Sequence, residues 1–313
     1  MNELKIIVLC SSRFALPAIY QLAYFQQLAV VLIPENCKEM IAETREALKA
    51  TNIPVITATK ENFAERASEA IHTCSVNMGL VLTFSYIIPR PVFELPVHGF
   101  YNVHPGPLPA YRGADPIFYQ IKNREPKAGV CIHKLDAGRD TGPVVLEEKI
   151  MLPSFYTYGM LSQELAGLAA KLIDTLTKII ALGFNVPSRP QNESKAHYYK
   201  KQSSQEFTVN WQTMDADSII ALMNACNPHN KGAATKLNHK KVHLISAEKD
   251  QNHETIPSAP GTILFLDDDC AEVAVINSGL LKINFVYTDE GFVSAGYLKQ
   301  MGAAKGMMFE NLF

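Results

Sequence analysis

The feature that most constrains the fold of this chain is the alternation of short apolar runs with longer amphipathic segments between Leu4 and Leu182. The apolar runs have the length of buried strands, and the segments between them have helical spacing. This alternation predicts an α/β fold with a doubly wound, mostly parallel sheet. The predicted strands are Leu4–Cys10, Leu28–Ile33, Pro54–Ile56, Met78–Phe84, Phe100–His104 and Gly129–Lys134, and the predicted helices are Phe14–Phe25, Glu39–Ala50, Asn62–Thr73, Pro116–Lys122 and Tyr158–Leu182.

A change of composition after residue 184 indicates a second domain. Residues 185–206 are rich in proline, serine and other polar residues, which predicts a linker. A short strand, Thr208–Trp211, and a helix, Asp215–Cys226 with Asp215 as its N-cap, are expected next. The further predicted strands are Ala233–Lys236, Val242–Ala247, Gly261–Phe265, Ala271–Ile276 and Gly279–Phe285. We therefore expect a catalytic domain in residues 1–184 and a small OB-like β-barrel domain in residues 207–313.

Composition excludes several classes of protein. The chain has 313 residues, a net charge of −2 and 47% hydrophobic residues, which are ordinary values for a soluble globular protein. Its apolar runs are too short to span a bilayer and no signal peptide is evident, so we expect a cytoplasmic protein without a membrane partner. The six cysteines are scattered without a CxxC pair, which favours free thiols. No metal site is predicted, because the histidines lack metal-ligand spacing.

The strongest candidate for catalysis is a polar pair, Asn102 and His104, at the end of a predicted strand. Residues two apart on a strand point to the same side. The proline-rich segment 105–109 then forces the chain out of the sheet as a stiff loop. Asp140 lies in a glycine-flanked loop further on. An Asn, a His and an Asp can together move a proton and stabilise an oxyanion at neutral pH.

Two other positions have more than one interpretation. The first strand–helix turn contains no glycine, which disfavours a dinucleotide site there. Its residues Ser11, Ser12 and Arg13 could bind a phosphate or a carboxylate at the helix N-terminus, or they could form a capping turn. Arg112 is either a surface residue of a turn or an anchor for the loop or for an anionic group of the substrate.

These motifs together resemble the formyltransferases that use N10-formyltetrahydrofolate. The motifs that carry the resemblance are Phe-Ala-Leu-Pro at 14–17, Asn-Val-His at 102–104, Pro-Leu-Pro at 107–109, Tyr-Arg-Gly at 111–113 and Asp-Thr-Gly at 140–142. The resemblance covers nearly the whole chain. The second half, with Val209–Trp211 and Pro260–Thr262, is most similar to that of the methionyl-tRNA formyltransferases, and the long-form amino-sugar formyltransferases share much of it.

The resemblance implies transfer of a formyl group from N10-formyltetrahydrofolate to a primary amine, with no metal required. It implies that Asn102 and His104 donate hydrogen bonds to the oxyanion, and that Asp140 supports His104 and helps to remove a proton. The residues implied for folate binding are Phe84, Ser85, Tyr86, Ile87, Ile88, Asp136, Ala137, Gly138 and Arg139. The residues expected to bind the acceptor are Ser11, Ser12, Arg13, Pro107, Leu108 and Arg112.

The charge pattern disfavours tRNA as the acceptor. The tRNA-acting relatives carry a basic insertion after the second strand, whereas Pro34–Lys49 contains three basic and four acidic residues here. From residue 201 onward there are nine lysines and thirteen acidic residues, a net charge of −4. A protein that neutralises several phosphates needs a basic face.

The identity of the amine and the oligomeric state stay open. A methionyl-tRNA formyltransferase with unusual electrostatics is one alternative, and an N-formyltransferase of nucleotide-linked amino sugars is another. A formyltetrahydrofolate hydrolase would use the same three residues, with water in place of the amine. A folate or nucleotide sensor without turnover is disfavoured because all three candidate catalytic residues are present.

Overall fold

The computed structural model describes residues 3–250, 258–277 and 279–313. The chain divides into two compact units. The first comprises Met1–Pro116, Lys127–Met151 and Ser162–Tyr199, and the second comprises Ile117–Pro126, Leu152–Leu161 and Lys200–Phe313. The helices α5 (Pro116–Lys122) and α6 (Tyr158–Ala181) therefore belong partly to each unit.

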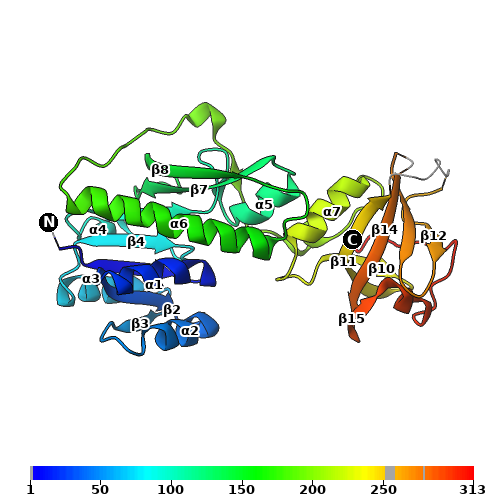
Figure 1. Ribbon diagram of the computed structural model, residues 1–313, viewed down its shortest axis with the longest axis horizontal. Coiled ribbons are helices and arrows are strands. Elements are labelled where there is room, and N and C mark those ends of the chain that lie inside the picture. Colours follow the sequence, from blue (N-terminus) through cyan, green and yellow to red (C-terminus); the bar gives the residue numbers. More distant parts are fainter. Residues whose placement is uncertain (1–2, 251–257, 278) are drawn as a thin grey trace. The chain divides into compact units, whose positions relative to one another are not determined.

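A seven-stranded sheet with the order β3-β2-β1-β4-β5-β7-β8 forms the centre of the first unit (Figure 1). Its strands are β1 (Ile6–Cys10), β2 (Leu28–Pro34), β3 (Val55–Ala58), β4 (Met78–Leu82), β5 (Phe100–His104), β7 (Lys127–Lys134) and β8 (Val144–Met151). Strands β1 to β5 are mutually parallel. Strand β7 pairs antiparallel with β5, and β8 pairs antiparallel with β7, so β8 again has the direction of the parallel strands. The predicted doubly wound, mostly parallel sheet is therefore confirmed.

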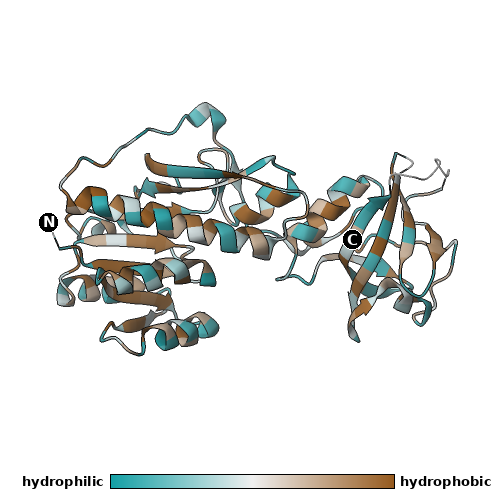
Figure 2. Ribbon diagram, viewed as in Figure 1, coloured by the Kyte–Doolittle hydropathy of each residue, from teal (hydrophilic) through white to brown (hydrophobic). Residues whose placement is uncertain are grey.

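Helices cover both faces of this sheet (Figure 1). They are α1 (Leu16–Tyr24), α2 (Lys38–Leu48), α3 (Phe63–Thr73), the short α4 (Arg90–Phe93) and the long α6. The central strands β1, β2 and β4 are apolar along their length, whereas the helices alternate between apolar and polar residues (Figure 2). One core cluster joins Ile7 and Leu9 of β1 to Phe63 and Ala67 of α3. Because strands β1 to β5 are parallel, their carboxyl ends lie at the same edge of the sheet.

The second unit is built on an antiparallel sheet with the order β10-β11-β14-β13-β12, and β15 also pairs with β14. Its strands are β10 (Ala233–Leu237), β11 (Lys240–Asp250), β12 (Ile263–Leu266), β13 (Ala271–Val275), β14 (Gly279–Thr288) and β15 (Gly291–Ser294). The helix α7 (Ala216–Ala225) begins after Asp215, whose side chain accepts a hydrogen bond from the Ser218 amide, as predicted.

The C-terminal segment joins the two outer strands of this sheet. The Glu310 amide donates to the Lys236 carbonyl at 2.8 Å beside β10, and the Ile263 amide of β12 donates to the Met307 carbonyl at 2.8 Å. Between them, the buried ring of Phe309 stacks on Trp211 with 5.4 Å between ring centroids. This arrangement gives the sheet a barrel-like closure, which is compatible with the expected OB-like domain.

The predicted strand Thr208–Trp211 is wrong. Only one isolated bridge, Thr208 with Ala234, forms there, and a turn begins at Asn210. The aromatic residue that suggested a strand packs in the core instead. The Trp211 side chain is fully buried, and its Nε1 donates to Thr235 Oγ1 at 2.8 Å. Tertiary packing thus takes the place of strand pairing.

Candidate active site

The pairing of β5 with β7 brings three polar side chains to one face of the sheet. Asn102 and His104 are two residues apart on β5, and Asn102 lies directly opposite His133 of β7. Asn102 Nδ2 is 3.0 Å from His133 Nε2. His133 is 1% exposed and was not among the predicted site residues. Its position opposite Asn102 depends on the register of two strands, which the sequence does not provide.

His104 is buried, and one of its two ring nitrogens is already committed. Nε2 lies 2.6 Å from the Tyr111 carbonyl oxygen, which can only accept, so Nε2 carries the proton. Nδ1 faces Asp140 Oδ1 at 3.8 Å. Burial lowers the pKa of His104, although Asp140 and the Tyr111 carbonyl act in the opposite direction. The ring is therefore neutral at pH 7, and its free lone pair points toward the Asp140 carboxylate.

The same reasoning assigns the proton of His133. Nδ1 lies 3.1 Å from the Lys134 carbonyl and donates to it, so Nε2 is free to accept the hydrogen bond from Asn102. His133 Nε2 is also 3.7 Å from Asp140 Oδ1. The two imidazoles and the Asn102 amide thus surround a single carboxylate oxygen.

Asp140 supplies a negative charge to this group. Its Oδ2 accepts from the Gly113 amide at 2.8 Å, and its Oδ1 accepts from Asn102 Nδ2 at 3.3 Å. Burial raises the pKa of this carboxyl, but the contact with His133, the nearby His104 and the Gly113 hydrogen bond together hold the pKa at about 2. The carboxylate is therefore ionised at neutral pH.

The segment predicted as a linker holds the Asp140 loop in place. Asp140 has a φ of +55°, which is uncommon outside glycine. Gln191 Nε2 donates to the carbonyls of Asp140 and Gly142, at 2.8 and 2.7 Å. Gln191 Oε1 in turn accepts from Arg112 Nε at 3.0 Å. Gln191 was not predicted to belong to the site.

Arg112 lies at the centre of this network. Its side chain is fully buried, and besides Gln191 it donates to Glu193 and to the Tyr198 hydroxyl. The strand β6 (Arg112–Gly113) also pairs with β9 (Tyr198–Tyr199). Since the guanidinium is already neutralised, this geometry favours the loop-anchoring interpretation of Arg112.

The residues expected to bind folate lie in two loops. Phe84, Ser85, Tyr86, Ile87 and Ile88 follow β4, and the rings of Phe84 and Tyr86 are 5.3 Å apart and both contact Phe63. Asp136, Ala137, Gly138 and Arg139 follow β7. Asp136 Oδ1 closes this second loop by accepting from the Gly138 amide and the Thr141 hydroxyl. Ile87, Ala137, Gly138 and Arg139 are exposed, so a ligand can reach them.

The first strand–helix turn is tied to the loop after β4. Ser11 Oγ accepts from the Ser85 amide at 3.1 Å, and Ser12 Oγ is 2.7 Å from Thr83 Oγ1. Arg13 Nε donates to Glu43 at 2.8 Å on the surface. Ser11 and Ser12 thus lie at the point where the strand order reverses, beside the expected folate loop. Arg13 is paired with a carboxylate of α2.

The described residues contain no group of three His, Cys, Asp or Glu side chains that could hold a metal ion. None of the helices in the described parts of the chain is long and apolar enough to cross a membrane.

The fold defines a class of protein: an α/β protein with a doubly wound sheet and a cluster of polar side chains near the carboxyl end of β5. Residues 4–176 match the family model described as formyl transferase, and residues 201–290 match the formyl transferase C-terminal domain. The chain belongs to the formyl transferase family.

Relatives of known sequence agree with this assignment, and solved structures share the fold. A methionyl-tRNA formyltransferase of Stenotrophomonas maltophilia is 30% identical over 74% of this chain and 75% of its own length. One of Rickettsia bellii is 30% identical over 83% of this chain and 86% of its own length. The N-formyltransferase of Helicobacter canadensis, solved with folinic acid and dTDP-3-aminofucose, has a TM-score of 0.68 at 16% identity, and covers 90% of this chain and 99% of its own.

HypX of Aquifex aeolicus, solved with tetrahydrofolic acid, has a TM-score of 0.63 at 18% identity over 95% of this chain. This chain spans about half of HypX, at 47% of its length. At these identities the solved structures support the fold alone.

Proposed function

We propose that this formyltransferase transfers the formyl group of N10-formyltetrahydrofolate to the primary amine of a small acceptor. The observation that carries the proposal is that Asn102 Nδ2 and His104 Nδ1 both face one carboxylate oxygen of ionised Asp140. A carboxylate, a neutral imidazole and an amide donor in contact are the groups that acyl transfer to an amine requires.

In the proposed mechanism the neutral amine attacks the formyl carbon and gives a tetrahedral oxyanion. One N–H of the Asn102 amide, whose Nδ2 now contacts His133 and Asp140, reorients and donates a hydrogen bond to this oxygen. The attacking nitrogen becomes positively charged as the C–N bond forms, and His104 Nδ1 takes one of its protons. The resulting imidazolium is stabilised by Asp140 at 3.8 Å. The Nδ1–H then serves as the second donor. The new C–N bond remains as the C–N10 bond breaks, and the proton passes to N10 of the departing tetrahydrofolate.

The proposed folate site lies between the loops after β4 and β7. The aromatic pair Phe84 and Tyr86 supplies an apolar wall, and exposed Ile87 extends it. Backbone groups of residues 136–139 supply polar contacts on the other side. Both loops adjoin the Asn102–His104–Asp140 group, so a folate bound there presents its N10 substituent to these residues.

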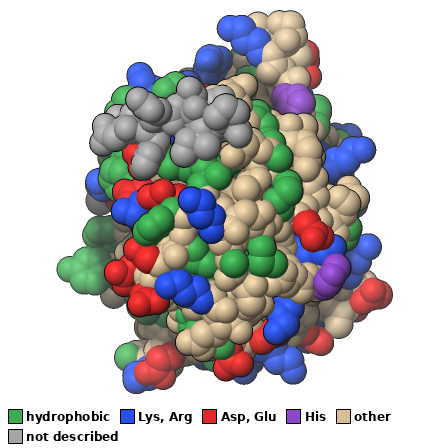
Figure 3. Space-filling model, turned by 90° about the vertical axis from the view of Figure 1, so that its right-hand side faces the viewer, with side chains coloured by type: hydrophobic (Ala, Val, Ile, Leu, Met, Phe, Trp, Pro, Cys, Tyr) green, Lys and Arg blue, Asp and Glu red, His purple; other side chains and the backbone are tan. Residues whose placement is uncertain are grey.

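The proposed acceptor is small because the chain lacks the electrostatics of a tRNA-binding protein. In α2, which follows β2, Glu43 and Glu39 pair with Arg13. Lysines and acidic residues are interspersed on the face drawn in Figure 3. Counterion release from a basic face supplies most of the sequence-independent affinity for nucleic acids. Methionyl-tRNA is the second candidate acceptor, favoured by the 30% identity to methionyl-tRNA formyltransferases over most of the chain.

Kinetics of the variants Asn102→Ala, His104→Ala and Asp140→Ala test the proposed site. We expect each to lower kcat by about 10²- to 10³-fold, the usual loss for one oxyanion donor, while folate still binds. Ser188→Ala in the exposed linker is the control and should keep wild-type turnover. Wild-type kcat in any of the three would remove that residue from the mechanism. Formate release without added amine would instead indicate hydrolysis.

A further inference from the structure

One buried polar side chain at the site has no step in the proposed mechanism. His133 lies on β7, directly opposite Asn102 of β5, and its ring is closed off from solvent. Side chains directly opposite each other on antiparallel strands are near enough to interact. A buried imidazole is costly unless its nitrogens have hydrogen-bond partners. The partners of this ring therefore indicate what it does.

The two ring nitrogens of His133 have opposite hydrogen-bonding roles. Nδ1 lies 3.1 Å from the Lys134 carbonyl oxygen, which can only accept, so Nδ1 carries the proton. Nε2 then has a lone pair, and Asn102 Nδ2 lies 3.0 Å from it. If the Asn102 amide were turned over, its carbonyl oxygen would face this lone pair. His133 thus favours the amide orientation in which the NH₂ group faces Nε2.

Asp140 favours the same orientation of the Asn102 amide. Its Oδ1 lies 3.3 Å from Asn102 Nδ2, and a turned amide would place a carbonyl oxygen against this carboxylate. Two acceptors therefore share the two N–H groups of one amide. The contact with His133 is the shorter of the two, so the N–H that faces Asp140 is the one that is less tightly held.

The backbone on one side of His133 is irregular. In the pairing of β7 with β8, Ile132 lies opposite Leu146, but His133 lies opposite Val144, so β8 has one extra residue at this point. Such β-bulges are common next to active sites, where they change the direction of a side chain. The regular ladder is thus interrupted at the residue that contacts Asn102.

The loop that carries Asp140 also packs on the His133 ring. A Cβ atom added to Gly142 would lie 3.3 Å from His133 Nδ1 and 1.8 Å from the Lys134 carbonyl oxygen. Only a glycine fits at this close approach. The hydrogen bond that fixes the proton of His133 is therefore enclosed by the same loop that supplies the carboxylate.

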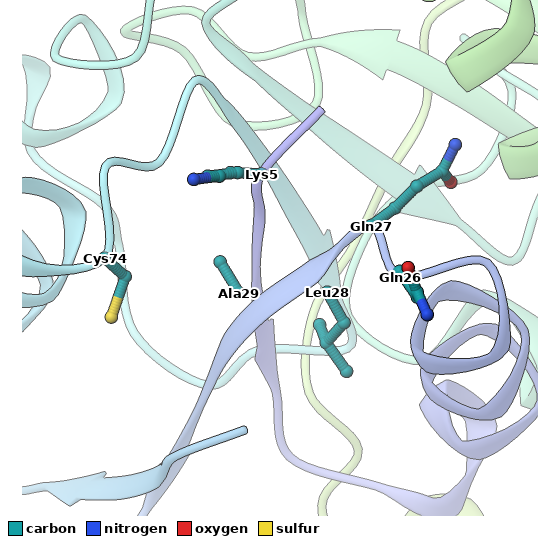
Figure 4. A pocket seen from close by; sticks show the side chains of 6 residues that line it. All are labelled: Lys5, Gln26, Gln27, Leu28, Ala29 and Cys74. Carbon is teal, nitrogen blue, oxygen red and sulfur yellow. The ribbon is translucent and has the colours of Figure 1, made fainter. Parts of the chain in front are cut away.

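The polar side chains around a cavity at the amino end of β2 are arranged differently. This cavity of about 270 Å³ is lined by Lys5, Gln26, Gln27, Leu28, Ala29 and Cys74. The side chains of Lys5 and Gln27 point away from each other (Figure 4). They do not orient one another, whereas Asn102 and His133 are in direct contact.

We propose that His133 is a positioning residue for formyl transfer and acts through Asn102. Its Nε2 holds one N–H of the Asn102 amide, so that the other N–H, which now faces Asp140, is the one that meets the oxyanion. A donor that is oriented before the reaction stabilises developing charge without a cost of reorganisation. This inference rests on the proposed function and adds to it a residue outside the three predicted ones.

A double-mutant cycle separates positioning from a merely structural role. His133→Leu removes the acceptor and should lower kcat by about 10- to 100-fold, the cost of a misplaced catalytic group, with little change in the KM for folate. Asn102→Ala/His133→Leu should be no slower than Asn102→Ala, because His133 has no other route to the reaction. His133→Gln, whose Oε1 can accept from Asn102, should restore most of the lost turnover. His72→Leu at an exposed position of α3 is the control. Wild-type kcat in folded His133→Leu, or losses that multiply in the double variant, would overturn the inference.

A ¹⁵N NMR spectrum of the full chain labelled at histidine tests the contact without requiring turnover. The signals of His133 are those that His133→Gln removes. We expect a proton on Nδ1 in the wild-type chain, and a shift of the Nε2 signal in Asn102→Ala. A proton on Nε2, or an unchanged Nε2 signal in Asn102→Ala, would overturn the inference. Absence of formyl transfer by the wild-type chain would instead contradict the proposed function, and the NMR result would then still decide whether His133 orients Asn102.

Discussion

At the residue scale, the position of one proton on each histidine decides what the site can do. The Nε2–H of His104 donates a hydrogen bond to the Tyr111 carbonyl, and the Nδ1–H of His133 donates one to the Lys134 carbonyl. In its neutral state, neither ring therefore has a second N–H to donate to Asp140. The proposed base is therefore His104 Nδ1. Burial lowers the pKa of His104, which keeps this nitrogen unprotonated until an amine delivers its proton.

The pKa of Asp140 predicts a specific pH dependence of stability. The folded pKa of about 2 lies below the ordinary value of about 3.9. Ionised Asp140 therefore stabilises the fold above about pH 4, by about 2 kcal/mol. This contribution is lost as the pH falls from about 4 to 2. Urea unfolding across this range should show a shallower pH dependence for Asp140→Asn, but not for Asp269→Asn at an exposed loop. Identical slopes for Asp140→Asn and wild type would refute the assignment.

Gln191 is predicted to position Asp140. Gln191→Glu replaces the amide donor with an oxygen that faces two carbonyls, so the Asp140 loop should shift. We expect kcat to fall by about 10- to 100-fold with little change in the KM for folate. Asn185→Ala, at an exposed position of the same segment, is the matched control. Wild-type kcat in a folded Gln191→Glu variant would exclude a positioning role.

At the element scale, strands and helices of the first unit were largely predictable because their periodicities are strong. The helix Pro116–Lys122 has the predicted bounds, and so has β5. Strands β8 and β15 were missed. Strand β8 is an edge strand with the exposed residues Glu147–Lys149, so its sequence lacks the apolar run of a buried strand.

The site was predictable to a different degree for each residue. Asn102, His104 and Asp140 belong to motifs that can be read along the chain, and the structure places them together. His133 reaches this group through the register of β5 with β7, which places it opposite Asn102. Gln191 reaches it through a hydrogen bond to Asp140, which is 51 residues away in the sequence. Contacts of that range are not encoded in local sequence patterns.

The C-terminal segment is predicted to stabilise the second unit by closing its sheet. Phe309→Ala removes a fully buried ring from Trp211 and should cost about 3–5 kcal/mol in free energy of unfolding. Phe313→Ala, at a side chain that is 67% exposed, should change the stability by less than about 0.5 kcal/mol. The single Trp211 reports the transition directly by its fluorescence during denaturation. Equal effects of the two substitutions would contradict this closure.

At the scale of the whole molecule, charge should determine how activity responds to salt. With a small acceptor, turnover between 50 and 200 mM salt should change only severalfold. Binding that neutralises six to ten phosphates would instead lose about 10³- to 10⁵-fold in affinity over the same range. Steady-state kinetics at several salt concentrations, with methionyl-tRNA and with nucleotide-linked amines, distinguish the two acceptors. A steep loss restricted to tRNA, combined with its efficient formylation, would favour the second candidate.

The central claim is formyl transfer to an amine by Asn102, His104 and Asp140, and the fate of a labelled formyl group tests it most directly. The full chain is incubated with N10-[¹³C]formyltetrahydrofolate and a panel of nucleotide-linked amino sugars plus methionyl-tRNA, and the carbon is followed by NMR. We predict that the label appears as a formamide on one amine and that Asp140→Asn lowers the rate of its formation by about 10²- to 10³-fold. Label that stays on bound folate, or leaves only as formate, would contradict the claim.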